Sequence, residues 1–134
     1  MNQEAIRNFI IIDDDSLSNT ICAKIIQLSV PGSATVSFTD PGEGLEYIYS
    51  KYKNINDEKV VLFLDINMPD ITGWDVLHKI EEIPGLTQQG LKIFMLSSSV
   101  SPDDKQKAAL YSLVSGFISK PLSNAKLGKL LQSI

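Results

Sequence analysis

Short apolar stretches alternate along this chain with segments of helical period, and this alternation constrains the fold more than any other feature of the sequence. Apolar runs without polar alternation are typical of strands that are buried on both faces of a sheet. When such strands alternate with helices, the helices cover both faces of a parallel sheet. We expect strands at Asn8–Asp13, Ala34–Phe38, Val60–Asp65, Lys92–Leu96 and Gly116–Ile118.

Turn and capping residues indicate where the helices lie. The first helix is expected to run from about Ser16, its N-cap, to Leu28. Its apolar face is expected to comprise residues that recur every three or four positions, Leu17, Ile21, Ile25 and Leu28. The later helices are expected to follow Asp40-Pro41, Gly73, Ser101-Pro102 and Pro121, and Pro84 should end the third. The fifth helix is expected to carry Leu122, Leu127, Leu130, Leu131 and Ile134.

This order of elements predicts an α/β fold. We expect a doubly wound, five-stranded parallel sheet with strand order 2-1-3-4-5, the flavodoxin-like (βα)5 arrangement, with right-handed connections. At 134 residues the chain has the length of one domain, so residues 1–134 are expected to form a single domain with none after the fifth helix. In this strand order the first and third strands are neighbours.

Composition excludes several classes of protein. The net charge of −4 argues against unaided binding of nucleic acid, which needs a clustered basic face. The apolar runs are too short to span a membrane, and the N-terminus does not have the pattern of a signal peptide. Cys22 is the only cysteine, so it cannot form a disulfide within the chain, which fits a reducing cytoplasm.

Polar side chains follow the strands at the points where they end. The acidic triplet 13–15 follows the first strand, and Asp65 ends the third. Ser97 follows the fourth strand and Lys120 the fifth. The carboxyl ends of parallel strands meet at one edge of a sheet, where ligands bind. Carboxylates crowded together there need a cation.

These motifs, in this order, resemble the receiver domain of two-component response regulators, the family typified by the chemotaxis response regulator. The most specific part is Asp65-Ile66-Asn67-Met68-Pro69, with Gly73 eight residues beyond the aspartate. Phe94-Met95-Leu96-Ser97 and Phe117-Ile118-Ser119-Lys120-Pro121 support it. The resemblance covers the chain from Phe9 to Ile134.

The resemblance implies roles for the acidic residues. Asp65 is the expected phosphoacceptor, which would take a phosphoryl group from a phosphohistidine. Asp14, Asp65 and the backbone carbonyl of Asn67 are the expected direct ligands of Mg²⁺, with Asp13 acting through water. Which aspartates of the triplet are used follows from the family pattern alone, and Asp15 is the alternate.

The resemblance also implies roles for residues after the last two strands. Lys120 would neutralise charge on the phosphoryl oxygens, and would pair with Asp65 when no phosphate is present. Ser97 would donate its hydroxyl to a phosphoryl oxygen, with Ser98 as the alternative in the serine-rich loop. Phe117 is either the aromatic switch residue of the family or an ordinary core ring. The Lys120-Pro121 bond would be cis by resemblance, whereas the frequency of cis bonds before proline predicts trans.

The function implied is a stand-alone phosphorylation switch in the cytoplasm, which catalyses only its own phosphoryl transfer and dephosphorylation. The implied donor is a histidine kinase or a phosphotransfer protein. A downstream protein target would bind the face formed by the fourth helix, the fifth strand and the fifth helix. Direct binding of nucleic acid and of membranes is not expected.

Two other functions share parts of this pattern. A Mg²⁺-dependent aspartyl-phosphate phosphatase would also use Asp65 as nucleophile, but such enzymes usually carry an acid two residues later, and Asn67 cannot donate a proton there. A flavin or nucleotide binder of this topology would need a Gly-rich or Ser/Thr-rich loop after the first strand, where this chain has aspartates that repel phosphate without a metal.

The remaining features are less informative. The segment between Ser97 and Lys120 is one residue longer than in the chemotaxis protein, so its fourth helix or the following loop should differ. Residues 67 and 99, Asn and Ser here, are at positions that tune dephosphorylation in the family. The single histidine, His78, is expected at the surface, and Trp74 is expected to serve packing.

Overall fold

The computed structural model describes residues 8–52, 59–83, 90–98, 102–111 and 113–133 of the chain. The predictions for Pro84, Ser99, Ser101 and Ile134 therefore concern positions outside the described residues.

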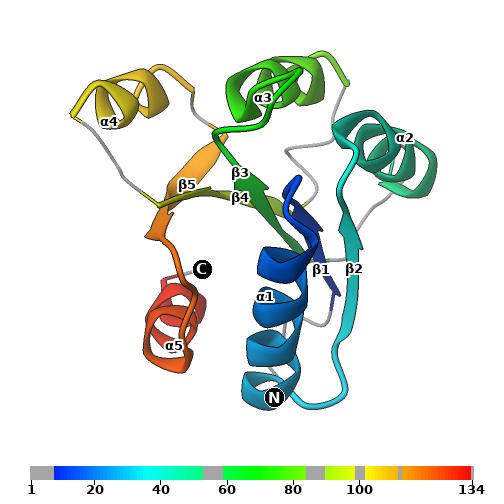
Figure 1. Ribbon diagram of the computed structural model, residues 1–134, viewed down its shortest axis with the longest axis vertical. Helices are drawn as coiled ribbons and strands as arrows, with labels where there is room; N and C mark the ends of the chain where they lie inside the picture. Colours follow the sequence, from blue (N-terminus) through cyan, green and yellow to red (C-terminus); the bar gives the residue numbers. More distant parts are fainter. Residues whose placement is uncertain (1–7, 53–58, 84–89, 99–101, 112, 134) are drawn as a thin grey trace.

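The described strands form one parallel sheet in the order β2-β1-β3-β4-β5, as the alternation of strands and helices predicted. β3 is buried along its whole length, as expected for a central strand with helices on both sides (Figure 1). The strands are β1 (Asn8–Ile12), β2 (Ala34–Phe38), β3 (Val60–Asp65), β4 (Leu91–Ser97) and β5 (Val114–Ser119).

The helices lie in two layers, one on each face of the sheet. α1 and α5 cover one face, and α2, α3 and α4 cover the other (Figure 1). Their bounds are α1 (Ser16–Ser29), α2 (Pro41–Tyr52), α3 (Gly73–Glu81), α4 (Pro102–Ala108) and α5 (Asn124–Gln132). The predicted doubly wound α/β fold is thus confirmed.

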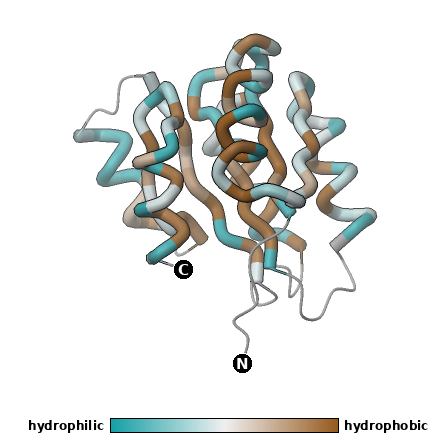
Figure 2. Tube along the Cα trace, turned by 90° about the horizontal axis from the view of Figure 1, so that it is seen from below, coloured by the Kyte–Doolittle hydropathy of each residue, from teal (hydrophilic) through white to brown (hydrophobic). Residues whose placement is uncertain are grey.

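Two hydrophobic clusters, one on each face, hold the layers together. Successive side chains of a strand point to opposite faces, so Ile10 and Ile12 of β1 belong to the cluster under α2, α3 and α4. Phe9 and Ile11 belong to the cluster under α1 and α5. Fully burying one such side chain contributes about 1.5–3 kcal/mol. Figure 2 shows hydrophobic stretches along the strands, and helices on which hydrophobic and hydrophilic residues alternate.

The prediction for the apolar face of α1 was wrong for three of its four residues. The buried residues of this helix are Asn19, Cys22 and Ile26, whereas Leu17 and Ile21 are 65% and 44% exposed. Two stripes of α1 have helical spacing, and periodicity alone does not select the one that faces the sheet. Leu28 is also exposed, whereas Ile25 is half-buried and packs against the cluster under α1 and α5.

Several element ends differ from the predicted ones. Asp15, not Ser16, caps α1, and its side chain accepts a hydrogen bond from the backbone N–H of Leu17. Leu122 precedes α5 and is buried; the cap of this helix is Ser123. β1 ends one residue earlier than predicted. β4 and β5 extend beyond their predicted bounds at both ends, and at the carboxyl end their ladder includes a polar pair, Ser97 and Ser119.

Gly73 lets α3 begin directly against the end of β3. Its backbone N–H donates to the oxygen of Ile66 at 2.8 Å. A Cβ at this position would overlap the backbone oxygen of Asp65, so any larger residue would push α3 away from the strand. A capping box between Thr72 and Asp75 stabilises this start of the helix.

Within the described parts of the chain, no helix has the length and apolar character that crossing a membrane requires.

Candidate functional site

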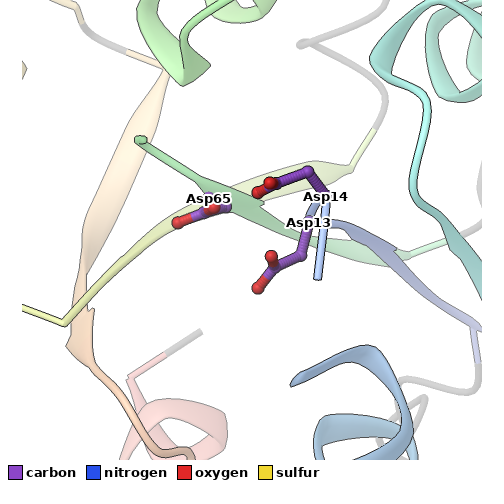
Figure 3. Close-up of side chains that lie close together, drawn as sticks. All are labelled: Asp13, Asp14 and Asp65. Carbon is purple, nitrogen blue, oxygen red and sulfur yellow. The ribbon is translucent and has the colours of Figure 1, made fainter. Parts of the chain in front are cut away.

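Three carboxylates meet where β1 and β3 end. Asp13 directly follows β1, and Asp65 is the last residue of the neighbouring β3. One carboxylate oxygen from each of Asp13, Asp14 and Asp65 lies within 4.8 Å of the others. Asp13 and Asp65 are buried and Asp14 is exposed, so the group opens to solvent on the side of Asp14. Figure 3 shows the three side chains at the carboxyl end of the sheet.

Backbone groups fix the position of Asp13. Its N–H donates to the oxygen of Phe38 at the end of β2, at 3.0 Å. Its Oδ1 accepts from the N–H of Asp15 at 3.0 Å. The position of the Asp13 carboxylate is therefore fixed by backbone groups of the chain itself.

Lys120 supplies positive charge between the two buried carboxylates. Its Nζ lies 2.7 Å from Oδ2 of Asp13 and 3.3 Å from Oδ1 of Asp65. The backbone N–H of Lys120 donates to the oxygen of Ser97 at 2.8 Å, which places it at the end of β4. The predicted pairing with Asp65 is present, but the shorter contact is with Asp13. The Lys120-Pro121 bond is cis.

Burial and the excess of negative charge in the site together shift the pKa values of Asp65 and Lys120. Burial, and then the charge of Asp13, raises the pKa of Asp65 to about 6, although Lys120 acts in the opposite direction. Burial by itself lowers the pKa of Lys120, but the hydrogen bond and charge of Asp13, followed by those of Asp65, outweigh burial and raise it. One lysine does not fully compensate three carboxylates.

The donor atoms fit a divalent cation of the hard type. All three groups offer carboxylate oxygen, which Mg²⁺ prefers, and the open side at Asp14 leaves room for the waters that this ion retains. The raised pKa of Asp65 shows that added positive charge would favour its ionised form. The residues that would hold Mg²⁺ are Asp13, Asp14 and Asp65.

Comparison with known families shows which family the chain belongs to. Residues 9–132 match the family described as the response regulator receiver domain. The chain belongs to this family. It is thus a receiver domain of a two-component system, and such domains act as signalling switches.

Solved structures agree with this assignment. The receiver is 26% identical to a two-component response regulator from Cytophaga hutchinsonii, with 96% of each chain covered and a TM-score of 0.85. It is 25% identical to a response regulator receiver protein from Dyadobacter fermentans, with 93% of this chain and 94% of that chain covered and a TM-score of 0.81.

The chemotaxis protein CheY4 of Vibrio cholerae shares the fold of this receiver, at 22% identity and a TM-score of 0.76, with 96% of this chain and 98% of that chain covered. A comparison with curated proteins found no match.

The structure separates the two candidate switch hydroxyls of the receiver. Ser97 is the last residue of β4 and is buried, and its register partner on β5 is Ser119. Ser98 is an exposed bend residue. β3 and β4 are neighbours, and Asp65 of β3 pairs with Leu96 of β4. Ser97 is therefore the residue of β4 that directly follows the partner of Asp65.

The structure places Asn67 in a loop and Phe117 on a strand. Asn67 is exposed in the loop after β3. Phe117 is half-buried on β5, and its ring centroid is 6.5 Å from that of Trp74 on α3, in an edge-to-face arrangement. Trp74 also stacks on Tyr111 at 5.9 Å. Trp74 thus packs against other side chains as expected, and one of them is Phe117, the candidate switch residue.

Sequence reasoning missed Lys126. Its Nζ donates to the backbone oxygens of Ser119 at 2.8 Å and Pro121 at 3.0 Å, and lies 3.3 Å from the hydroxyl of Ser119. These groups flank Lys120, so Lys126 ties α5 to the loop that carries the site lysine. A lysine in the first turn of a helix gives no sequence signal for such a role.

Proposed function

We propose that this receiver accepts a phosphoryl group on Asp65 from a phosphohistidine of a histidine kinase or phosphotransfer protein. The observation that carries the proposal is the placement of Asp65 as a buried carboxylate beside two further carboxylates and an ammonium group. Such a setting suits phosphoryl transfer, which demands a positioned nucleophile and neutralised charge more than covalent work by the protein.

The transfer needs only the groups described above. An oxygen of Asp65 forms a bond to phosphorus while the bond from phosphorus to the histidine nitrogen breaks, and the electron pair stays on that nitrogen. Mg²⁺, held by Asp13, Asp14, Asp65 and the backbone carbonyl of Asn67, would supply charge neutralisation when bound. Lys120 would move its ammonium from the carboxylates to a phosphoryl oxygen.

The hydroxyl of Ser97 would donate to another phosphoryl oxygen and carry the signal onward. A phosphoryl group adds nearly two negative charges, and drawing Ser97 towards them would change the packing of Phe117 on β5. The burial of Ser97 supports this residue over Ser98.

The partner surfaces follow from what lies around Asp65. A cleft of about 150 Å³ opens beside Lys120 and is lined by Leu17 and Ile21 of α1. An apolar surface of a donor protein that docks on this stripe would stand next to the phosphoacceptor. We assign the downstream target to the face of α4, β5 and α5; Leu110, in the turn between α4 and β5, is 80% exposed.

We further propose that the receiver acts as a stand-alone switch in the cytoplasm. The free thiol of Cys22 is buried, and burial, followed by the charge of Asp13, raises its pKa to about 12. Such a thiol stays in its unreactive protonated form. A single free thiol of this kind fits the reducing cytoplasm.

Turnover of outside phosphate esters has less support. Asn67 occupies the position where an aspartyl-phosphate phosphatase carries its acid, and an amide cannot donate that proton.

The test is incubation with acetyl phosphate and MgCl₂ followed by intact mass measurement. We expect one phosphoryl adduct per chain, lost in Asp65→Asn. Asp70→Asn is the matched control, because Asp70 is an exposed acid in the same loop, and it should keep the adduct. Steady release of phosphate from varied monoesters, without a stable adduct, would contradict the proposal.

A further inference from the structure

Asn19 is a polar side chain on the buried face of α1, where its neighbours are Cys22 and Ile26. It is 4% exposed. Its Nδ2 donates to the backbone oxygen of Asp13 at 2.9 Å and lies 3.5 Å from the backbone oxygen of Phe38. One side chain thus contacts the peptide after β1 and the end of β2.

The orientation of this amide is determined by its neighbours. Both backbone groups near Nδ2 are acceptors, so turning the amide over would place its oxygen against two carbonyl oxygens. In the present orientation Oδ1 is buried and has no hydrogen-bond partner among the described residues. A buried acceptor without a partner lowers stability, so packing alone does not explain an asparagine here.

The contact completes the restraints on Asp13. Its backbone N–H is bound by Phe38 and its backbone oxygen by Asn19. Its carboxylate contacts the N–H of Asp15 and the Nζ of Lys120. With both backbone groups held, the turn from β1 into α1 has one conformation, and that turn also carries Asp14.

We propose that Asn19 is a positioning residue that holds the turn after β1 so that the carboxylates of Asp13 and Asp14 converge with that of Asp65. It acts through the backbone of Asp13 and touches none of the reacting atoms. The inference rests on the proposed function, because its consequence is the affinity of the acidic group for Mg²⁺ before any phosphoryl transfer.

The test compares Mg²⁺ binding of the whole chain and its variants by calorimetric titration with MgCl₂ at pH 7. Asn19→Leu keeps a similar size but removes both donors, so the dissociation constant should rise at least tenfold, the range typical for residues that orient metal ligands. Ile26→Val is the control, because it lies on the same buried face and makes a small cavity without touching Asp13. Its dissociation constant should stay within twofold of the original.

A second variant keeps the test decisive. In Asn19→Ser the hydroxyl would bond to the helix carbonyl four residues earlier, as serine does within helices, so it too should weaken Mg²⁺ binding. A folded Asn19→Leu or Asn19→Ser protein that binds Mg²⁺ within twofold of the original overturns the inference. Failure of both variants to fold also overturns it, since Asn19 would then serve the fold itself. If the original chain does not bind Mg²⁺, the proposed function fails instead.

Discussion

The ammonium group of Lys120 lies closer to Asp13 than to Asp65, at 2.7 Å against 3.3 Å. In this state Lys120 therefore compensates mainly the carboxylate that is proposed to bind Mg²⁺ through water, and less the one that is proposed to attack phosphorus. A phosphoryl group on Asp65 would have to attract the ammonium away from Asp13. This competition links the acceptance of phosphate to the charge balance among Lys120, Asp13 and Asp65.

Removal of Lys120 should destabilise the metal-free receiver. Lys120→Met leaves Asp13 and Asp65 as buried carboxylates without their counter-charge. Breaking a buried pair costs about 3–5 kcal/mol, and we expect the lower end because Lys120 is partly solvated. Urea unfolding at pH 7 measures the change. Added MgCl₂ should restore much of the loss, and a loss that MgCl₂ leaves unaltered would argue against a shared role of the two cations.

The stability of the metal-free receiver should depend on pH through Asp65. Its pKa is raised from 3.8 to about 6, so between these values the folded chain binds more protons than the unfolded chain. The free energy of unfolding therefore falls as pH rises through this window, by about 3 kcal/mol at most from this group. Asp65→Asn should remove this contribution and stabilise the metal-free protein at pH 7. Urea unfolding between pH 4 and pH 7 compares the two, and equal slopes would contradict the prediction.

Mg²⁺ should stabilise the folded receiver in proportion to the logarithm of its concentration. A ligand at one hundred times its dissociation constant adds about 2.7 kcal/mol. Thermal unfolding with increasing MgCl₂ measures the effect, and Asp14→Asn should reduce it strongly. The control is Asp103→Asn in α4, which is exposed and outside the acidic group. An unchanged response of Asp14→Asn would exclude Asp14 as a ligand.

Gly73→Ala should be among the more damaging single changes. The added Cβ would overlap the backbone oxygen of Asp65, and we expect a loss of about 1–3 kcal/mol, the range typical of overpacking. Gly128→Ala in α5 is the matched control because its Cβ would meet nothing within 4 Å. It should stabilise the protein by about 0.5–1 kcal/mol, as alanine does in a helix interior. Similar effects at both sites would refute the steric argument.

A substitution in the exposed stripe of α1 should slow phosphotransfer from a protein donor but not from a small-molecule donor. Ile21→Glu places a charge in the cleft beside Lys120, so phosphotransfer from a cognate histidine kinase or phosphotransfer protein should slow at least tenfold. Uptake from acetyl phosphate should change by less than twofold. Equal slowing with both donors would indicate damage to the site rather than loss of docking.

Sequence patterns predicted the sheet order and the meeting of acids at its edge because both depend on strands whose burial is visible as apolar runs. They did not predict the buried face of α1, since the exposed leucines there have the same spacing as a core stripe. The contacts of Asn19 and Lys126 were also missed. Asn19 bonds to the backbone oxygen of Asp13, and Lys126 bonds to those of Ser119 and Pro121. No residue pattern marks which distant side chain will reach such a backbone oxygen.

The bonds from Lys126 to the oxygens of Ser119 and Pro121 have a thermodynamic consequence. They connect α5 to the segment around Lys120, so a protein that binds α5 and displaces it would also displace the ammonium group of Lys120. Linkage is reciprocal. If a target binds the phosphorylated form more tightly than the unphosphorylated form by some factor, binding of the target shifts the equilibrium towards phosphorylation by the same factor. The equilibrium population of the phosphorylated form would then depend partly on the target protein that binds it.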